Sequence, residues 1–193
     1  MVEFNHFKNI GFLLSKFTQE QLQPVRDEIL KIQKNFEDSK KANYSLSGHI
    51  KKEYFLSESK TTIEHLILPL IVEYDGQYKN LSRSSYLTKS CEIVLDDVWV
   101  NFQKKHEFNP PHTHGGLMSF VIWINVPFDI KNEQSMFPDI DTNGATNNYT
   151  ANFMFHYIDS IGKIGIAGLP VDKSWENKIA LFPSSMMHSV HPL

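Results

Sequence analysis

The spacing of apolar residues changes near residue 90, and this change constrains the fold more than any other feature of the sequence. Before that point apolar residues recur with the period of an amphipathic helix. After it they alternate with polar residues, as in strands with one buried face. Helices followed by strands are typical of a mainly β domain with N-terminal helices. We expect one domain over residues 1–193, with mainly helical support in 1–88 and the sheet core in 89–193.

Two amphipathic helices are expected in the first part of the chain. Their apolar stripes lie over residues 22–36 and 63–71, and capping-box patterns stand at residues 18–21 and 61–64. Pro24 is expected either to delay the first helix or to kink it. Asp75 and Gly76 are expected to end the second helix. Residues 38–56 have no regular period and are expected to be irregular.

Short strands with turn signals between them follow, which is typical of a sandwich or a barrel. The expected strands cover residues 98–103, 119–126, 153–158, 161–169 and 178–182, and a further short one covers residues 7–15. Residues 128–149 interrupt the alternation with a long, polar, aperiodic stretch. This stretch is either a lid or substrate-binding insertion at the rim of the barrel, or a solvated hairpin loop.

Charge and composition exclude some classes of partner. The net charge of −3 indicates no dedicated nucleic-acid surface. The longest apolar run, Leu66–Val72, is about a third of a membrane span, and the N-terminus lacks the pattern of a signal peptide. Cys91 is the only cysteine, and we expect it to be buried in a strand. These features predict a soluble, cytoplasmic protein without a membrane or nucleic-acid partner, and they carry no signal for its oligomeric state.

Four histidines form two close pairs, His112 with His114 and His188 with His191. Two imidazoles separated by one residue in an extended segment point to the same face. A third imidazole from a later strand, such as His188, would complete one side of a metal's coordination shell. The positions left open are those that an iron(II) oxygenase needs for oxygen and cosubstrate. Imidazole also suits zinc, copper and nickel, so the residue type alone does not choose the metal.

Two other histidines are candidates for a supporting role near this metal. His191 is expected either to lie behind the ligands or at the rim of the site, or to replace one of the three ligands. His156 alternates with Phe155 and Tyr157 on an expected strand. It is therefore expected either to support the site or to hydrogen-bond within the wall of the barrel.

The segments around these histidines resemble a known family. Trp99-Val-Asn101, Asn109-Pro-Pro-His-Thr-His-Gly-Gly116 and Phe182-Pro-Ser-Ser-Met-Met-His188, together with the strand after Gly116, are similar to iron(II)/2-oxoglutarate oxygenases of the prolyl-4-hydroxylase-like group. The resemblance is narrower to an uncharacterised branch found in marine bacteriophages and marine bacteria. Its specific part covers about a fifth of the chain. It implies a double-stranded β-helix, which is a jelly-roll, cupin-like barrel, here buttressed by helices.

The resemblance also implies a cofactor set and a reaction. The cofactors would be Fe(II) and 2-oxoglutarate, and a carbon of a peptidyl or small-molecule substrate would be hydroxylated. His188 would be the distal iron ligand and His112 the first ligand. His114 stands where the family has a carboxylate, and it or a water would fill that position. Asn101, Ser119 and Trp123 would contact the cosubstrate or line its cavity.

One departure from the family pattern concerns the far carboxylate of 2-oxoglutarate. The family uses a basic residue, usually arginine, on a strand after the distal histidine. The arginines of this chain are Arg26 and Arg83, both before the sheet core. Either the sequence lacks the last strand of the barrel, or another group such as Lys178 or Lys163 binds the carboxylate. The alternatives to an oxygenase are a cupin-like metal enzyme without 2-oxoglutarate and a non-catalytic jelly-roll binding module.

Overall fold

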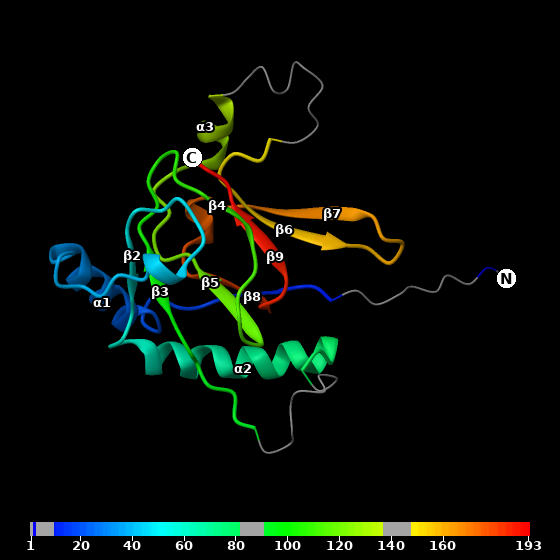
Figure 1. The fold of residues 1–193 in the computed structure, drawn as a ribbon, viewed down its shortest axis with the longest axis horizontal. Helices are drawn as coiled ribbons and strands as arrows, with labels where there is room; N and C mark the ends of the chain where they lie inside the picture. The colour runs from blue at the N-terminus through cyan, green and yellow to red at the C-terminus, as the bar shows by residue number, and fades with distance from the viewer. Residues whose placement is uncertain (1, 3–9, 82–90, 137–147) are drawn as a thin grey trace.

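The computed structural model describes residues 2, 10–81, 91–136 and 148–193, which form mainly β-sheet with two helices near the N-terminus (Figure 1). The helices are α1 (Gln23–Lys34), α2 (Lys60–Tyr78) and the short α3 (Ile130–Ser135), with 3-10 turns at Asn43–Ser45 and Lys173–Trp175. The strands are β1 (Leu13–Lys16), β2 (Glu53–Phe55), β3 (Trp99–Asn101), β4 (Asn109–His112), β5 (Met118–Ile122), β6 (Asn152–Ile158), β7 (Ile164–Pro170), β8 (Lys178–Pro183) and β9 (Met187–Val190). The prediction of a mainly β fold with N-terminal helices is confirmed.

The strands form three antiparallel sheets, with orders β1-β8-β5, β2-β3 and β4-β9-β6-β7. The three-stranded and four-stranded sheets pack against each other through aromatic side chains. The ring of Phe182 on β8 lies 4.9 Å from the ring of Phe155 and 6.2 Å from that of Phe153, both on β6. Two layers with an aromatic interior are the arrangement of a β-sandwich. Within the described residues the sheets do not close into a barrel.

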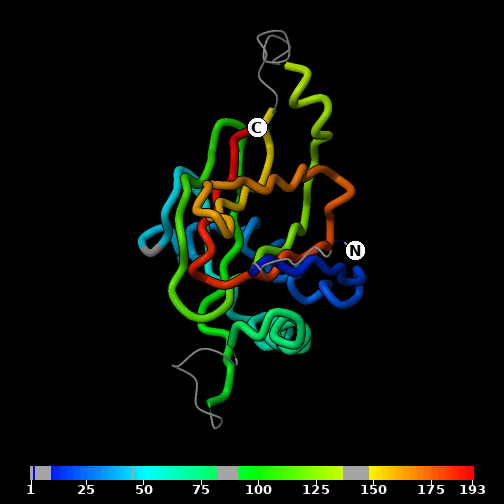
Figure 2. The backbone as a smooth tube through the Cα atoms, turned by 90° about the vertical axis from the view of Figure 1, so that its right-hand side faces the viewer, coloured from blue at the N-terminus to red at the C-terminus, as the bar shows by residue number. Residues whose placement is uncertain are grey.

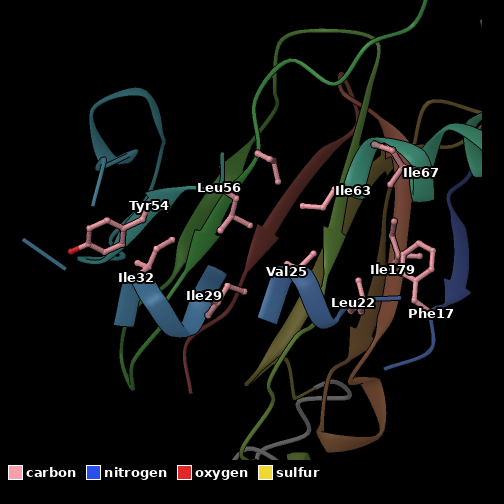
Figure 3. Close-up of a cluster of buried hydrophobic side chains, with 11 residues drawn as sticks. Phe17, Leu22, Val25, Ile29, Ile32, Tyr54, Leu56, Ile63, Ile67 and Ile179 are labelled. Carbon is pink, nitrogen blue, oxygen red and sulfur yellow. The ribbon is translucent and has the colours of Figure 1, made fainter. Parts of the chain in front are cut away.

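Helices α1 and α2 cover the other face of the three-stranded sheet (Figure 3). The buried members of this cluster include Val25, Ile29 and Ile32 of α1, Ile63 and Ile67 of α2, and Ile179 of β8. Their three- and four-residue spacing is the one that predicted the helices. Figure 2 shows α2 almost end-on beneath the strands. The helical part therefore covers one face of the sheet and leaves the opposite face to the four-stranded sheet.

The helix boundaries differ from the sequence predictions at three points. Thr18 and Gln21 do exchange the capping-box hydrogen bonds, at 2.8 and 3.2 Å, but they close a turn ahead of α1. Pro24 lies in the first turn of α1, which confirms the expected delayed start of this helix and excludes the alternative of a kink. Thr61 lies inside α2 and caps nothing, and α2 continues past Gly76 to Tyr78.

The strand predictions are corrected at other points. Residues 38–56 were expected to be irregular but contain β2, and the N-terminal strand begins at Leu13 within the described residues. Cys91 is exposed and outside any strand, because only a few residues of the segment before β3 pack inward. In the stretch 128–149, Asp129 caps the helix α3 through the N–H groups of Lys131 and Asn132. The remainder of that stretch, 137–147, lies outside the described residues, and so does Arg83.

A buried carboxyl group lies on β2, opposite Asn101 of β3. Glu53 is 2% exposed, and its Oε2 accepts a hydrogen bond from Asn43 Nδ2 at 2.9 Å. Its Oε1 is buried without a hydrogen-bond partner among the described residues. Burial, and secondly the nearby charge of Glu107, raise the pKa of Glu53 to about 7.

Replacing Glu53 with glutamine is expected to stabilise the protein at high pH. A raised pKa means that the contribution of Glu53 is fully present below about pH 4.5, the ordinary value, and is lost as pH rises through about 7. Glu53→Gln keeps an oxygen for Asn43 and removes the buried charge. Urea unfolding should show the variant about 2 kcal/mol more stable than the wild type near pH 8, with little difference near pH 5. An equal difference at both pH values would contradict this account.

Candidate metal centre

Two neighbouring strands of the four-stranded sheet bring His112 and His188 together. Strand β4 pairs antiparallel with β9, and His112 stands directly opposite His188 in the register. Side chains directly opposite each other share one face of the sheet, and the two imidazole rings lie 4.3 Å apart. Pro110 and Pro111 are tolerated in β4 because it is an edge strand. The sequence-predicted pair, 76 positions apart in the chain, is therefore adjacent in space.

His114 joins the pair from the loop after β4. Its N–H donates to the carbonyl of Ser184 at 2.9 Å, and Ser184 N–H donates to the carbonyl of Leu117 at 3.1 Å. Gly116 has a φ of +83°, which side-chain-bearing residues rarely adopt, and this lets the loop return to β5. The His114 ring lies 4.9 Å from that of His112 and 5.0 Å from that of His188. One nitrogen from each ring lies within 4.8 Å of the others, so the three histidines could hold a metal ion.

Backbone carbonyls fix the orientation of two of the three rings. His112 Nδ1 lies 2.7 Å from the carbonyl oxygen of Pro110, and His188 Nδ1 lies 3.0 Å from that of Met186. A carbonyl oxygen only accepts, so each Nδ1 donates a proton to it. The Nε2 atom of each ring then carries a free lone pair. This is the tautomer that a metal-binding histidine needs, and a carbonyl behind the ring is a usual way to impose it.

Burial lowers the pKa of two of the three imidazoles, those of His114 and His188. His188 is 4% exposed, and burial lowers its pKa to about 4, assisted by the other histidines, while the bond to Met186 acts in the opposite direction. Burial, and secondly the charge of His112, also lower the pKa of His114. Neutral imidazole is the form that binds metals. The site is therefore ready to accept a cation near neutral pH without first releasing protons from these two rings.

Aromatic rings surround the centre on its inner side. The ring of Phe153 stacks on His188 with centroids 5.4 Å apart, and that of Phe182 lies 4.9 Å away. Trp99 of β3 contacts His114 edge to face at 5.6 Å. His112 and His114 are only half-buried. The centre thus has an apolar wall on the sandwich side and an open side at the two half-buried histidines.

The four residues expected to contact the cosubstrate lie in different surroundings. Ser119 is linked to the centre through Ser184: its hydroxyl lies 2.9 Å from the Ser184 hydroxyl, and the Ser184 carbonyl accepts the N–H of His114. Trp123 packs edge to face against Trp175 at 5.0 Å. The ammonium of Lys178 lies 4.3 Å from the centre of the same Trp175 ring. Asn101 is exposed, two residues along β3 from Trp99.

His156 and His191 lie on the face of the sheet that points away from the centre. His156 stands opposite Met187, next to the pair of Phe155 with His188, so its side chain points to the other face. Its Nε2 is 2.9 Å from the hydroxyl of Ser189. The alternation along β9 places His191 on that same face, where its ring lies 6.0 Å from that of Tyr149. Neither ring belongs to the group of three histidines that could hold the ion.

Several residues that shape the centre were not predicted from sequence. These are the carbonyls of Pro110 and Met186, the hydroxyl of Ser184, and the rings of Trp99 and Phe153. Each carbonyl belongs to the residue two positions before its histidine. That shared spacing is a signal that the sequence contains, and it could have indicated the tautomer.

The guanidinium of Arg26 donates a hydrogen bond to the side chain of Asn177, next to β8. Arg26 is therefore not placed to bind the far carboxylate of 2-oxoglutarate. None of the helices in the described ranges is long and apolar enough to cross a membrane.

The triad of His112, His114 and His188 is the feature of the described chain that indicates a chemical function. No family model, curated protein or solved structure matches this chain.

Proposed function

We propose that this protein is an iron(II)- and 2-oxoglutarate-dependent dioxygenase with a jelly-roll core, which hydroxylates a peptidyl or small-molecule substrate. The observation that supports it best is the triad of His112, His114 and His188, with two Nε2 atoms freed by backbone carbonyls. Three ligands on one side of a cation leave the positions that oxygen activation requires. The sequence resemblance around the same residues supports the choice of iron and 2-oxoglutarate among the metals and cosubstrates that imidazole allows.

The sheet order supports the jelly-roll part of the proposal. From β4 to β9 the chain passes back and forth between the two sheets of the sandwich, except that β6 and β7 are neighbours in one sheet: β4, β6, β7 and β9 lie in one sheet, β5 and β8 in the other. Chains that wind back and forth between two antiparallel sheets in this way build double-sheet jelly rolls. The ligands stand at the end of the sandwich where β4, β9 and the start of β5 meet (Figure 1).

The chain's own residues would bind, orient and shield the cofactors. Bound iron(II) would supply the oxygen chemistry, coupled to decarboxylation of 2-oxoglutarate. His112 and His188 would hold the ion in orientations set by Pro110 and Met186. Phe153 and Phe182 would exclude water from the inner side. The hydroxyl of Ser119, which lies beside that of Ser184, would donate a hydrogen bond to a carboxylate oxygen of 2-oxoglutarate.

A turnover assay tests this function directly. With iron(II), 2-oxoglutarate and oxygen, the wild-type protein should form succinate at least about tenfold faster than the His112→Ala variant, because the variant loses an ion ligand. Zinc-loaded protein is the matched control, since zinc has no redox chemistry. Succinate formation that is equal in the variant and the wild type, or absent from iron-loaded wild type, would rule out the proposal.

A second candidate is a cupin-like metal enzyme that does not use 2-oxoglutarate. The observation that favours it is the ligand set, because three neutral imidazoles leave the full charge of a divalent ion on the site, with no carboxylate to offset it. The ammonium of Lys178 is also engaged with the ring of Trp175. Metal-dependent oxygen uptake that is unaffected by 2-oxoglutarate would support this candidate over the first.

A further inference from the structure

The three histidines of the candidate metal centre are not held equally. His112 and His188 stand opposite each other on paired strands, and a backbone carbonyl binds the Nδ1 atom of each ring. The strand pairing fixes where these two side chains begin, and the carbonyls fix how their rings are turned. Both rings are therefore oriented for an ion before any ion binds.

His114 combines a fixed backbone with a ring that no hydrogen bond holds. Its N–H donates to the carbonyl of Ser184 at 2.9 Å, which keeps its backbone in place. Neither nitrogen of its ring has a hydrogen bond to any residue in the described part of the chain. Gly115 borders open space, since a Cβ there would have no heavy atom within 4 Å apart from those of its chain neighbours. The ring of His114 can therefore rotate about its side-chain bonds while the backbone stays still.

Trp99 is the contact that selects one orientation of this ring. The indole meets the imidazole of His114 edge to face, with centroids 5.6 Å apart and planes at 60°. Aromatic pairs prefer such geometry, so the indole favours the rotamers of His114 that keep it. Trp99 is itself braced, because Phe55 stands directly opposite it across the ribbon of β2 and β3. An aromatic edge thus does for His114 what the carbonyls do for the other two ligands.

His114 also lies on the open side of the centre. Both His114 and Trp99 are half-buried. His188 is 4% exposed, and the rings of Phe153 and Phe182 lie against it. A small molecule from solution can therefore reach the place of His114 without displacing a core side chain, whereas the place of His188 is closed to it.

We propose that His114 is the exchangeable ligand of this metal centre, and that Trp99 is the positioning residue that keeps the His114 ring on the ion. A ligand from solution takes the place of this ring while His112 and His188 retain the ion. The indole of Trp99 thereby sets how readily that position opens. This inference rests on the metal centre of the proposed function, but it is independent of iron and of 2-oxoglutarate.

A double-mutant cycle tests the role of Trp99. Calorimetric titration with Zn²⁺ should show an affinity about tenfold lower in Trp99→Leu than in the wild type, because leucine has no aromatic edge. Trp99→Phe keeps a ring and should lose less than about threefold. In the His114→Ala background, Trp99→Leu should also change the affinity less than about threefold, because the ring on which Trp99 acts is gone.

The same cycle can overturn this role. Circular dichroism establishes that each variant is folded. An equal loss of affinity from Trp99→Leu in both backgrounds would mean that Trp99 supports only the fold, and the assignment would fail. Wild-type affinity in folded Trp99→Leu protein would also end it.

Added imidazole tests the exchange of His114. His114→Ala should lose at least about tenfold less Zn²⁺ affinity than His188→Ala, because the two oriented ligands remain. Millimolar imidazole should then raise the affinity of His114→Ala at least about tenfold relative to the wild type in the same buffer. It should leave His188→Ala unchanged, because Phe153 and Phe182 close that place. Rescue of both variants, or of neither, would overturn the exchange.

Succinate formation by the same proteins separates this inference from the proposed function. Coupling and rescue in a protein that forms no succinate would support the exchangeable ligand and remove the oxygenase. Additive losses in a protein that forms succinate would remove this inference alone. Wild-type protein that binds no Zn²⁺ would overturn it outright.

Discussion

Replacing His188 with alanine is expected to remove the metal from this protein. His188 is the most buried of the three ligands, and its Nε2 lone pair is held toward the other two rings by the bond to Met186. Removing it leaves two half-buried histidines, of which His114 comes from a loop. Mutation of residues that merely support ligands costs about 10- to 100-fold in metal affinity, so loss of a ligand should cost at least about 100-fold. Calorimetric titration with Zn²⁺ or with Fe²⁺ under nitrogen measures this.

Two other histidines provide matched controls for that experiment. His156 on β6 and His191 just after β9 lie on the outward face of the same four-stranded sheet, and His156 bonds Ser189. Alanine at either position changes the histidine count and the strand surface in the same way, so metal affinity should change less than about tenfold. His112→Ala should resemble His188→Ala. Retention of wild-type affinity in folded His188→Ala protein, judged by circular dichroism, would remove the central assignment of this site.

The position of the metal centre was predictable because it depends on local rules. Alternation in an extended segment places His112 and His114 on one side, and prolines before the pair enforce that extension. His188 was found through its resemblance to a family motif, since nothing local indicates which later strand lies beside β4. The face of His156 was predictable as well. It alternates with Phe153 and Phe155, whose side chains fill the sandwich, so its own side chain had to point outward.

Other features depend on contacts between distant residues, and sequence patterns do not contain them. Strand β2 is only three residues long and includes the buried Glu53, so its apolar period is too short to detect. It exists because Tyr54 and Val100 pair across the ribbon. The start of α2 also depends on a contact between distant residues. The sequence pattern at Thr61 suggested a local cap, but the stabilising carboxylate comes from α1.

Replacing Glu28 with alanine is expected to destabilise the fold strongly. The carboxylate of Glu28 on α1 accepts the N–H groups of Ser57, Glu58 and Ser59, at 2.7, 2.9 and 2.7 Å, and the hydroxyl of Ser59 at 2.6 Å. It is 4% exposed and lies at the positive end of the α2 dipole. The alanine variant leaves several buried donors unpaired, so unfolding in urea should show a loss of about 3 kcal/mol or more.

The pH dependence of stability and a neighbouring glutamate distinguish this role from a general effect of charge. Burial alone raises the pKa of Glu28, but the bonds from Ser59 and from the three N–H groups outweigh burial and hold the pKa below its ordinary value. A lowered pKa gives stability that is present above about pH 4.5 and is lost as pH falls through the folded-state value. Glu28→Gln should therefore lose this acid-sensitive part of the stability.

Glu58 is the matched control, because it pairs with Lys31 at 2.5 Å with both side chains more than half exposed. Such surface pairs contribute at most about 1 kcal/mol, so Glu58→Ala should stay within that range. If Glu28→Ala and Glu58→Ala lowered stability equally, the link between α1 and α2 would not rest on this carboxylate.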